Sequence, residues 1–319
     1  MPSDKDLQFD GRLTNVAIQY QNPEYIADLV VPPTPVPNEK FTYKQYDKDE
    51  RFTVPETLVG RKSVPAEVDW NVTEKTGTTK DYGDEVYVSQ KDIDNADAPI
   101  APLADATDLA TQLIRLDHEK RIADEVFKAT NYGTTIDIAG AWATLSTDAL
   151  TQLEVGIDTC FVSPNVMVMG IETWRKLARN EKVLAAVKGT LAPQALKTGS
   201  VGVPAVNQEE LASYLGLDAV LVGRARINTA KKGQTASYKR VWDGTNATKG
   251  GAALLRVKAG AALRNVVWGA NFTWKQRQAF TRGTEKGAYG GQYVRVIESM
   301  TFHLVASDVG YLFIDCLVT

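Results

Sequence analysis

Apolar and polar positions alternate with a period of two in much of residues 40–90. In 66–75, Val68, Trp70 and Val72 are separated by polar residues, and in 40–46 Phe41 and Tyr43 alternate in the same way. Such alternation is typical of half-buried β-strands. A third strand is expected at 83–89, and turn-forming residues fill 54–66. The pattern predicts a long two-stranded excursion, which needs support from other elements because an isolated ribbon is barely stable.

The longest helical pattern covers residues 103–131, with Asp105 or Thr107 as a candidate N-cap and Gly133 as its expected end. One apolar stripe contains Ala106, Leu109, Ala110, Leu113 and Leu116, and a second, turned around the axis, contains Ile122, Ala123, Val126 and Phe127. Apolar groups on more than one face indicate a helix that is buried between other elements.

Helical and strand patterns alternate after this helix. Helices are expected near 146–155, at 172–178 and at 207–217, and strands at 161–169 and 218–228. This alternation predicts a compact α/β lobe. The last third of the chain predicts strands at 235–242, 252–257, 264–274, 293–305 and 309–318. The fold class expected from these patterns is α+β.

The first 39 residues are expected to form an extended arm. Four prolines between Pro32 and Pro37 fix φ and remove hydrogen-bond donors, so this stretch should not be helical. A flexible linker is one interpretation. The apolar residues that precede the prolines, from Val16 to Val31, favour an arm that docks on the surface of a neighbouring molecule.

Composition narrows the class of protein. The chain has 319 residues with 44% hydrophobic residues, enough for a sizeable core in one or two domains. No apolar run is long enough for a transmembrane helix, and the polar N-terminus does not resemble a secretory signal. Cys160 and Cys316 are the only cysteines, which favours reduced thiols and folding in a cytoplasm.

His118-Glu119 is the candidate for chemistry, because His-Glu on a helix begins the zinc motif H-E-x-x-H. The second histidine would have to stand at position 122, where the chain has Ile122, and the other histidine is His303. No nucleophile elbow, phosphate-binding loop or dinucleotide fingerprint is present. We therefore expect no catalytic residue, metal or cofactor. Glu119 falls on an apolar face and should need a partner, for which Arg115 is one option.

Charge is divided unevenly along the chain. Residues 1–100 have 11 Lys and Arg against 19 Asp and Glu, a net of −8, while residues 224–264 contain ten basic residues and one acid, Asp243. The basic segment can contact phosphate, form a solvated face, or meet the acidic part of another copy. Aromatic residues are sparse there, so we prefer contact between subunits, with Lys231 and Lys232 as candidates.

The order of these parts resembles the major capsid proteins of tailed bacteriophages, which have the HK97-type fold. The residues that carry the resemblance best are NADAPIAPLADATDLATQLIRLDHEKRIADEVF (95–127), similar to the spine helix of that family's peripheral (P) domain, and SPNVMVMGIETWRKLARNEKV (163–183), similar to the start of its axial (A) domain. Glu119, one turn before Ile122-Ala123, matches a glutamate common in that helix.

The resemblance implies a domain division. Residues 1–39 would be the N-terminal arm, 40–90 the E-loop hairpin region lying over a neighbour, 91–160 the P domain with spine helix 103–131, 161–265 the A domain, and 266–319 the returning P-domain strands. Candidates for contact between subunits are Arg61, Lys62, Trp70, Glu119, Lys231 and Lys232. Some relatives crosslink Lys to Asn; Lys62 has the right place, but no partner is identifiable.

The function implied is a shell protein that assembles through hexamers and pentamers into an icosahedral capsid around double-stranded DNA. Its expected partners are further copies of itself, portal and scaffolding proteins, packaged DNA through non-specific contacts and a decoration protein, with no membrane. It would be found in the virion and be assembled in the host cytoplasm. An encapsulin compartment of the same fold, or a cytoplasmic α+β enzyme with an unrecognised site, are the alternatives.

Overall fold

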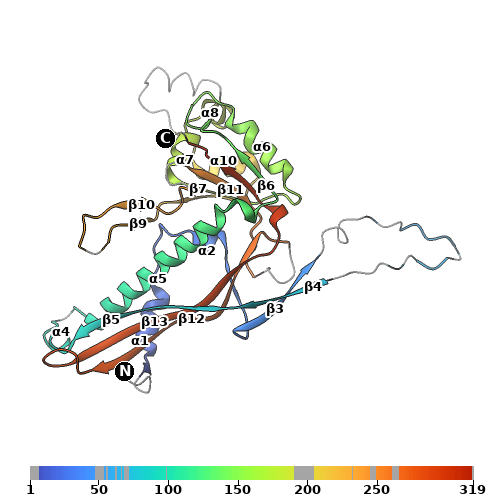
Figure 1. Ribbon diagram of the computed structural model, residues 1–319. Coiled ribbons are helices and arrows are strands. Elements are labelled where there is room, and N and C mark those ends of the chain that lie inside the picture. The colour runs from blue at the N-terminus through green and yellow to red at the C-terminus, as the bar shows by residue number, and fades with distance from the viewer. Residues whose placement is uncertain are drawn as a thin grey trace.

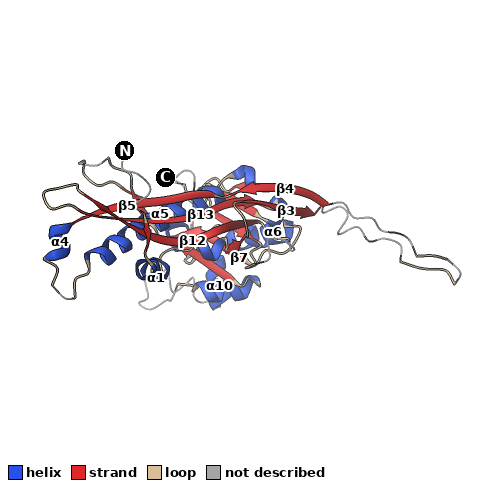
Figure 2. Cartoon of the chain, turned by 90° about the horizontal axis from the view of Figure 1, so that it is seen from below, coloured by secondary structure: helices blue, strands red, loops and turns tan. Residues whose placement is uncertain are grey.

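Two five-stranded sheets organise the chain (Figures 1 and 2). The structure, a computed structural model, describes residues 7–46, 54, 57–61, 63–65, 67, 72–97, 99–189, 205–231, 233–244, 249–260 and 266–317. Helices and strands are mixed, as the sequence patterns predict for an α+β chain.

The first sheet is long, and its strands run in the order β1-β12-β13-β5. Its members are β1 (Gln8–Phe9), β5 (Lys80–Ser89), β12 (Gly269–Thr284), β13 (Gly291–Leu304) and β2 (Pro33–Pro35), which pairs with β12 in parallel. β12 and β13 form a hairpin, and β13 pairs with β5 along ten residues, from Gly291–Ser89 to Met300–Lys80. The strands at 264–274 and 293–305 are thus present, and both are longer than the patterns predicted at one end.

Helix α5 (Pro102–Val126) lies along this sheet, against β5 and β13 (Figure 1). The predicted long helix is confirmed, although its last predicted turn is a separate 3-10 turn, η2 (Ala129–Asn131). Pro102 occupies its first position, and neither Asp105 nor Thr107 caps it. A single face is buried in its first half, around Ala106, Ala110 and Ile114, because small side chains let the helix approach the sheet.

Two leucines of the predicted stripe do not face the core. Leu109 is 48% exposed and Leu113 is 45% exposed, so that part of the prediction is wrong. The buried face is centred about one residue further along the helix, at Ala110 and Ile114, than the leucine positions suggested. The predicted stripe thus lies close to the buried face of the helix. Its alanines pack in the core with residues of the sheet, and its leucines at 109 and 113 do not.

The second sheet forms the other lobe, with the strand order β6-β14-β11-β7-β8. Its strands are β6 (Thr134–Asp137), β7 (Val166–Gly170), β8 (Ala219–Gly223), β11 (Gly251–Leu255) and β14 (Tyr311–Ile314). The helices α6 (Ala149–Thr159), α7 (Ile171–Leu177), α8 (Glu181–Lys188) and α10 (Gln208–Leu215) pack beside it. All residues of β7 and β11 are buried, as expected for central strands.

The second sheet combines strands from three of the segments expected from the resemblance. β6 lies within 91–160 and β14 within 266–319, both assigned to the P domain from the resemblance, yet both belong to the sheet of the other lobe. The cause is the pairing of β14, which forms an antiparallel ladder with β11 and a parallel one with β6.

Gly216, the expected stop of the 207–217 helix, is the C-cap of α10. Its φ of 68° is a left-handed conformation that favours glycine.

The N-terminal segment is not an extended arm over its whole length. It contains α1 (Gly11–Gln19), capped by the side chain of Asp10, and α2 (Ala27–Val30). Ala17 and Val31 are 0% exposed and Val30 is 1% exposed, because α1 and α2 pack on α5 and β12 of the same chain. Of the apolar residues attributed to docking on a neighbour, Ile26, Val30 and Val31 fill this chain's own core, whereas Ile18 and Leu29 are exposed. The proline stretch is extended as predicted, as strand β2.

A two-stranded ribbon projects from the body. β3 (Lys40–Tyr46) pairs with β4 (Val72–Thr78) in antiparallel register, which confirms the predicted excursion at its base (Figure 1). Phe41 and Tyr43 are buried at this base, and the Phe41 ring lies 4.5 Å from that of Phe272 on β12. These aromatic contacts anchor the ribbon. Two smaller elements complete the described chain, α4 (Gln90–Asp94) and the hairpin of β9 (Arg226–Asn228) and β10 (Tyr238–Arg240).

Candidate functional site

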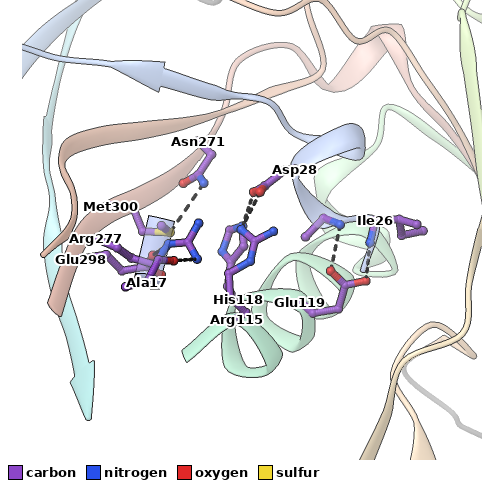
Figure 3. A network of polar contacts seen from close by, with 11 residues as sticks. Ala17, Ile26, Asp28, Arg115, His118, Glu119, Asn271, Arg277, Glu298 and Met300 are labelled. Carbon is purple, nitrogen blue, oxygen red and sulfur yellow. Dashed lines mark hydrogen bonds and ion pairs between the residues drawn. The ribbon is translucent and has the colours of Figure 1, made fainter. Parts of the chain in front are cut away.

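The middle of α5 carries a buried polar junction that joins α5 to the N-terminal segment (Figure 3). A hydrogen bond from Trp242 links the same junction to the second lobe. Glu119 is its centre and is 1% exposed. Its Oε1 accepts the backbone N–H of Ile26 at 2.8 Å and Nε1–H of Trp242 at 2.7 Å, and its Oε2 accepts the N–H of Ala27 at 2.9 Å. No side chain within α2 caps that helix, so Glu119 supplies the acceptors at its N-terminus.

Burial and hydrogen bonding have opposite effects on the pKa of Glu119. Burial raises the pKa of Glu119, and the hydrogen bonds from Ile26, Ala27 and Trp242 oppose that shift. All three partners are N–H donors, so both carboxylate oxygens must accept. The arrangement therefore suits a structural carboxylate. All three partners belong to this chain, and contact of Glu119 with a neighbouring subunit stays a prediction.

Asp28 forms the second part of the junction. Nη1 of Arg115 lies 2.5 Å from Asp28 Oδ2, and Nε2 of His118 lies 3.2 Å from Asp28 Oδ1. Burial would raise the pKa of Asp28, but the hydrogen bond to His118 and the charge of Arg115 outweigh it and hold that pKa well below its usual range. Arg115, expected as a partner of Glu119, is thus the partner of Asp28.

A third buried pair ties α1 to the first sheet. Arg277 of β12 donates through Nη1 to the carbonyl oxygen of Ala17 at 2.9 Å, and its Nε lies 3.6 Å from Oε2 of Glu298 on β13. Burial raises the pKa of Glu298 and lowers that of Arg277. The sequence patterns gave no signal for Asp28, Trp242, Arg277 or Glu298, because each is defined by a contact with a distant segment.

The described residues include both histidines and both cysteines of the chain. They contain no group of three or more His, Cys, Asp or Glu side chains that could hold a metal ion. His303 lies on β13 among the rings of Phe41, Tyr43 and Phe272, with centroids 5.6–5.9 Å away. Burial lowers the pKa of His303 and raises that of Cys160 to about 11, so at neutral pH the histidine is neutral and the thiol is protonated. In the part of the chain that is described, no helix has the length and apolar content to cross a membrane.

The remaining predicted contact residues lie on the surface or outside the described residues. Arg61 is exposed in the excursion, and Lys231 is exposed between β9 and β10. Lys62, Trp70 and Lys232 lie outside the described residues.

The excursion also carries exposed apolar side chains that the sequence patterns missed. Val54, Leu58 and Val64 are 86–89% exposed. Folded proteins do expose single apolar residues, but several at nearly full exposure on one protruding segment indicate a surface for binding. The available signal was the presence of leucine and valines in the turn-rich stretch 54–66, where they match neither strand nor helix periodicity.

The comparisons with known proteins identify the family. The chain is 36% identical over 316 residues to the major capsid protein of Pseudomonas phage JBD67, and the match covers 98% of each protein. This chain belongs to the major capsid proteins of tailed bacteriophages. A scan against protein-family models gave no match.

Solved structures show that the capsid protein has the HK97-type fold. A phage-related protein from Bordetella bronchiseptica superposes with a TM-score of 0.71 at 15% identity, covering 98% of this chain and 99% of that one. The capsid of cyanophage P-SCSP1u gives a TM-score of 0.57 at 9% identity, over 89% and 86%. The fold alone leaves the encapsulin alternative open, and the 36% identity to a phage protein decides for a phage capsid.

Proposed function

We propose that this capsid protein assembles through hexamers and pentamers into an icosahedral shell that encloses double-stranded DNA. The observation that carries the proposal is the exposure of Val54, Leu58 and Val64 on the projecting excursion. Burying an apolar side chain of this size contributes about 1.5–3 kcal/mol. An unassembled subunit gains none of this, so the excursion is stabilised when it lies on another copy.

The domain division is proposed from the resemblance, adjusted for the sheets. The region 40–90 is the E-loop, 91–160 and 266–319 supply most of the P domain, and 161–265 supplies most of the A domain. Strands β6 and β14 join the A-domain sheet by their pairing with β11 and with each other. Residues 7–39 hold α5 in their own subunit and contribute little as a free arm.

The contacts between subunits are proposed to include charged residues. The proposed contact residues are Arg61, Lys62, Lys231 and Lys232, together with the uncharged Trp70. Portal and scaffolding proteins, a decoration protein and packaged DNA are proposed as further partners. The shell belongs to the virion, is assembled in the host cytoplasm and has no enzymatic role.

The alternative, an α+β enzyme, would instead show turnover by isolated subunits, and this turnover would be lost on changing His118.

The test is assembly of the expressed chain, observed by negative-stain microscopy and sedimentation. We expect closed shells from the wild type and loss of shells from the double variant Leu58→Asp, Val64→Asp, with the subunit still folded. The matched control is Leu58→Ile, Val64→Ile, which keeps both positions apolar and should assemble normally. Normal shells from the aspartate variant would show that the excursion does not bind a neighbour.

A further inference from the structure

A basic cleft of about 630 Å³ is lined by residues of α5, of α7 and of the base of the β9–β10 hairpin. Four of its lining residues are arginines: Arg175, Arg224, Arg226 and Arg240. The same lining includes Asn22, Gln112 and one acid, Glu24. Glu119 and Asp28 form their hydrogen bonds and ion pairs with other residues and not with these arginines.

The four arginines of the cleft differ in how they are paired: Arg240 forms ion pairs, and Arg226 interacts with Asp243 through its charge without forming an ion pair. Arg240 is engaged, with Nη2 at 2.9 Å from Oε1 of Glu172 and Nε at 4.0 Å from Oδ2 of Asp243. Its Nη1 is nevertheless buried without a hydrogen-bond partner in the described part of the chain. Arg175, Arg224 and Arg226 are exposed, and none forms an ion pair with a described residue.

Three such guanidinium groups on one wall repel each other unless an anion lies between them. A planar guanidinium binds a carboxylate or phosphate through two parallel hydrogen bonds, and these bonds are stronger when water is excluded. The amides of Asn22 and Gln112, which also line the cleft, can donate further hydrogen bonds. The cleft is therefore built to receive an oxyanion, and its volume is large enough for more than one side chain.

Charge complementarity favours carboxylates of another copy as the occupant. The chain has a net charge of −8 over residues 1–100, so its copies offer acidic surface at the concentration of assembly. DNA is less well matched, because the cleft is a pocket with an acid on one wall, whereas a duplex backbone needs a row of positive charges on an open surface.

We propose that this cleft is a carboxylate-binding site in which acidic side chains of a second copy of the chain dock during assembly. The proposal rests on the proposed shell function and names a site within it. Arg224 and Arg226 are the main ligands, Arg175 and Arg240 complete the positive wall, and Asn22 and Gln112 orient the incoming carboxylates.

Two double variants at the same positions test the site. Arg224→Lys, Arg226→Lys keeps the charge and should assemble, whereas Arg224→Glu, Arg226→Glu reverses it and should reduce shell yield by about tenfold or more. The wild-type yield should also fall as salt is added, because exposed ion pairs are screened. Urea unfolding of the reversed variant, compared with wild type, separates a folding defect from an assembly defect.

The lysine variant also identifies the occupant. A carbodiimide couples a lysine amine to a carboxylate in direct contact, with loss of water and formation of an amide. Shells made from a mixture of ¹⁵N-labelled and unlabelled subunits should give crosslinked peptides that join Lys at 224 or 226 to an acid of the other isotope. Unassembled subunits should lack this product.

The outcomes separate the two proposals. Shells from the wild type and from the glutamate variant in equal yield, or crosslinks only to Glu24 of the same chain, would overturn the carboxylate site while the shell function stands. Normal shells from the glutamate variant with loss of retained DNA would assign the cleft to phosphate instead. Failure of the wild type to form shells under any condition would count against the shell function itself.

Discussion

Trp242 donates a 2.7 Å hydrogen bond through its indole N–H to Oε1 of Glu119. The two residues are 123 positions apart, and Trp242 is 0% exposed. The same oxygen accepts the N–H of Ile26, so one carboxylate joins the N-terminal segment, the spine helix α5 and the lobe of the second sheet. A single buried group thereby fixes the relative position of three segments within one subunit.

Replacing Glu119 should destabilise the subunit. In Glu119→Gln, the amide nitrogen cannot accept, so at least one of the donors from Ile26, Ala27 and Trp242 loses its partner. A buried donor without a partner costs about 1–3 kcal/mol. Urea unfolding of purified unassembled subunits should show a free energy of unfolding lower by that amount.

The control for this experiment lies on the same helix. Asp124 accepts from Lys120 at 2.5 Å, but the side chains of Asp124 and Lys120 are 58% and 46% exposed. Asp124→Asn should change the free energy of unfolding by no more than about 0.5 kcal/mol, because exposed ion pairs contribute little. Equal effects of the two substitutions would contradict the structural role of Glu119.

Removal of residues 1–38 should prevent stable folding of the subunit. This segment covers α5 and β12, and it carries the N–H groups that Glu119 binds. The sharper test uses two neighbours on α1: Ala17→Asp places a charge at a position that is 0% exposed, whereas Ile18→Asp changes one that is 45% exposed. Circular dichroism should report a large loss of stability for the first substitution only.

A folded, monomeric product of the truncation would show that the segment is an independent arm after all. Equal tolerance of the aspartate at positions 17 and 18 would lead to the same conclusion, because a packed α1 cannot accept a charge at Ala17.

Asp243 should make stability depend on pH. Burial, together with repulsion from Glu172, raises the pKa of Asp243 to about 6, while Arg240 and Arg226 oppose the shift. Because the folded-state pKa lies above the ordinary value, the stabilising contribution is complete below about pH 4 and is lost as pH rises through 6. Relative to Asp243→Asn, the wild type should lose about 1–3 kcal/mol of unfolding free energy between pH 4 and 7.

Unfolding curves of both proteins at a series of pH values give this difference directly. A difference between wild type and Asp243→Asn that stays constant with pH would show that Asp243 has an ordinary pKa in the folded subunit.

Reversal of Lys231 and Lys232 to Glu should weaken assembly more than it weakens subunit folding. Lys231 is exposed on the hairpin, so its replacement removes no packed contact of the subunit. Sedimentation would measure shells, and urea unfolding would measure the subunit. Shells in normal yield would refute the proposal that the hairpin charges contact a neighbour.

The sequence marked Glu119 as a buried acid that needs a partner, and this was correct. Its place beside Ile122 and Ala123 on one helical face follows from the helical period alone. The partners did not follow, because Ile26 and Trp242 approach Glu119 only when α2 and the second lobe are in place. The suggested partner, Arg115, was the nearest one in sequence, and the structure pairs it with Asp28 instead.

The N-terminal segment shows the same division. Its apolar residues were recognised, but the pattern does not say whether the surface that covers them is in the same chain or in another. The exposed Leu58 and Val64 illustrate the opposite case, in which apolar residues in a turn-rich stretch remain uncovered within the subunit.

The sequence by itself determined the long helix, the alternating strands, the uneven charge and the order of parts that resembles a capsid protein, because these depend on local periodicity and composition. The tertiary structure alone decided that β14 pairs with β11 and β6, that β2 pairs with β12, and that α1 and α2 belong to the core. Strand pairing and the hydrogen bonding of buried charges depend on contacts between residues that are distant in sequence. Local periodicity does not predict which distant residues form these contacts.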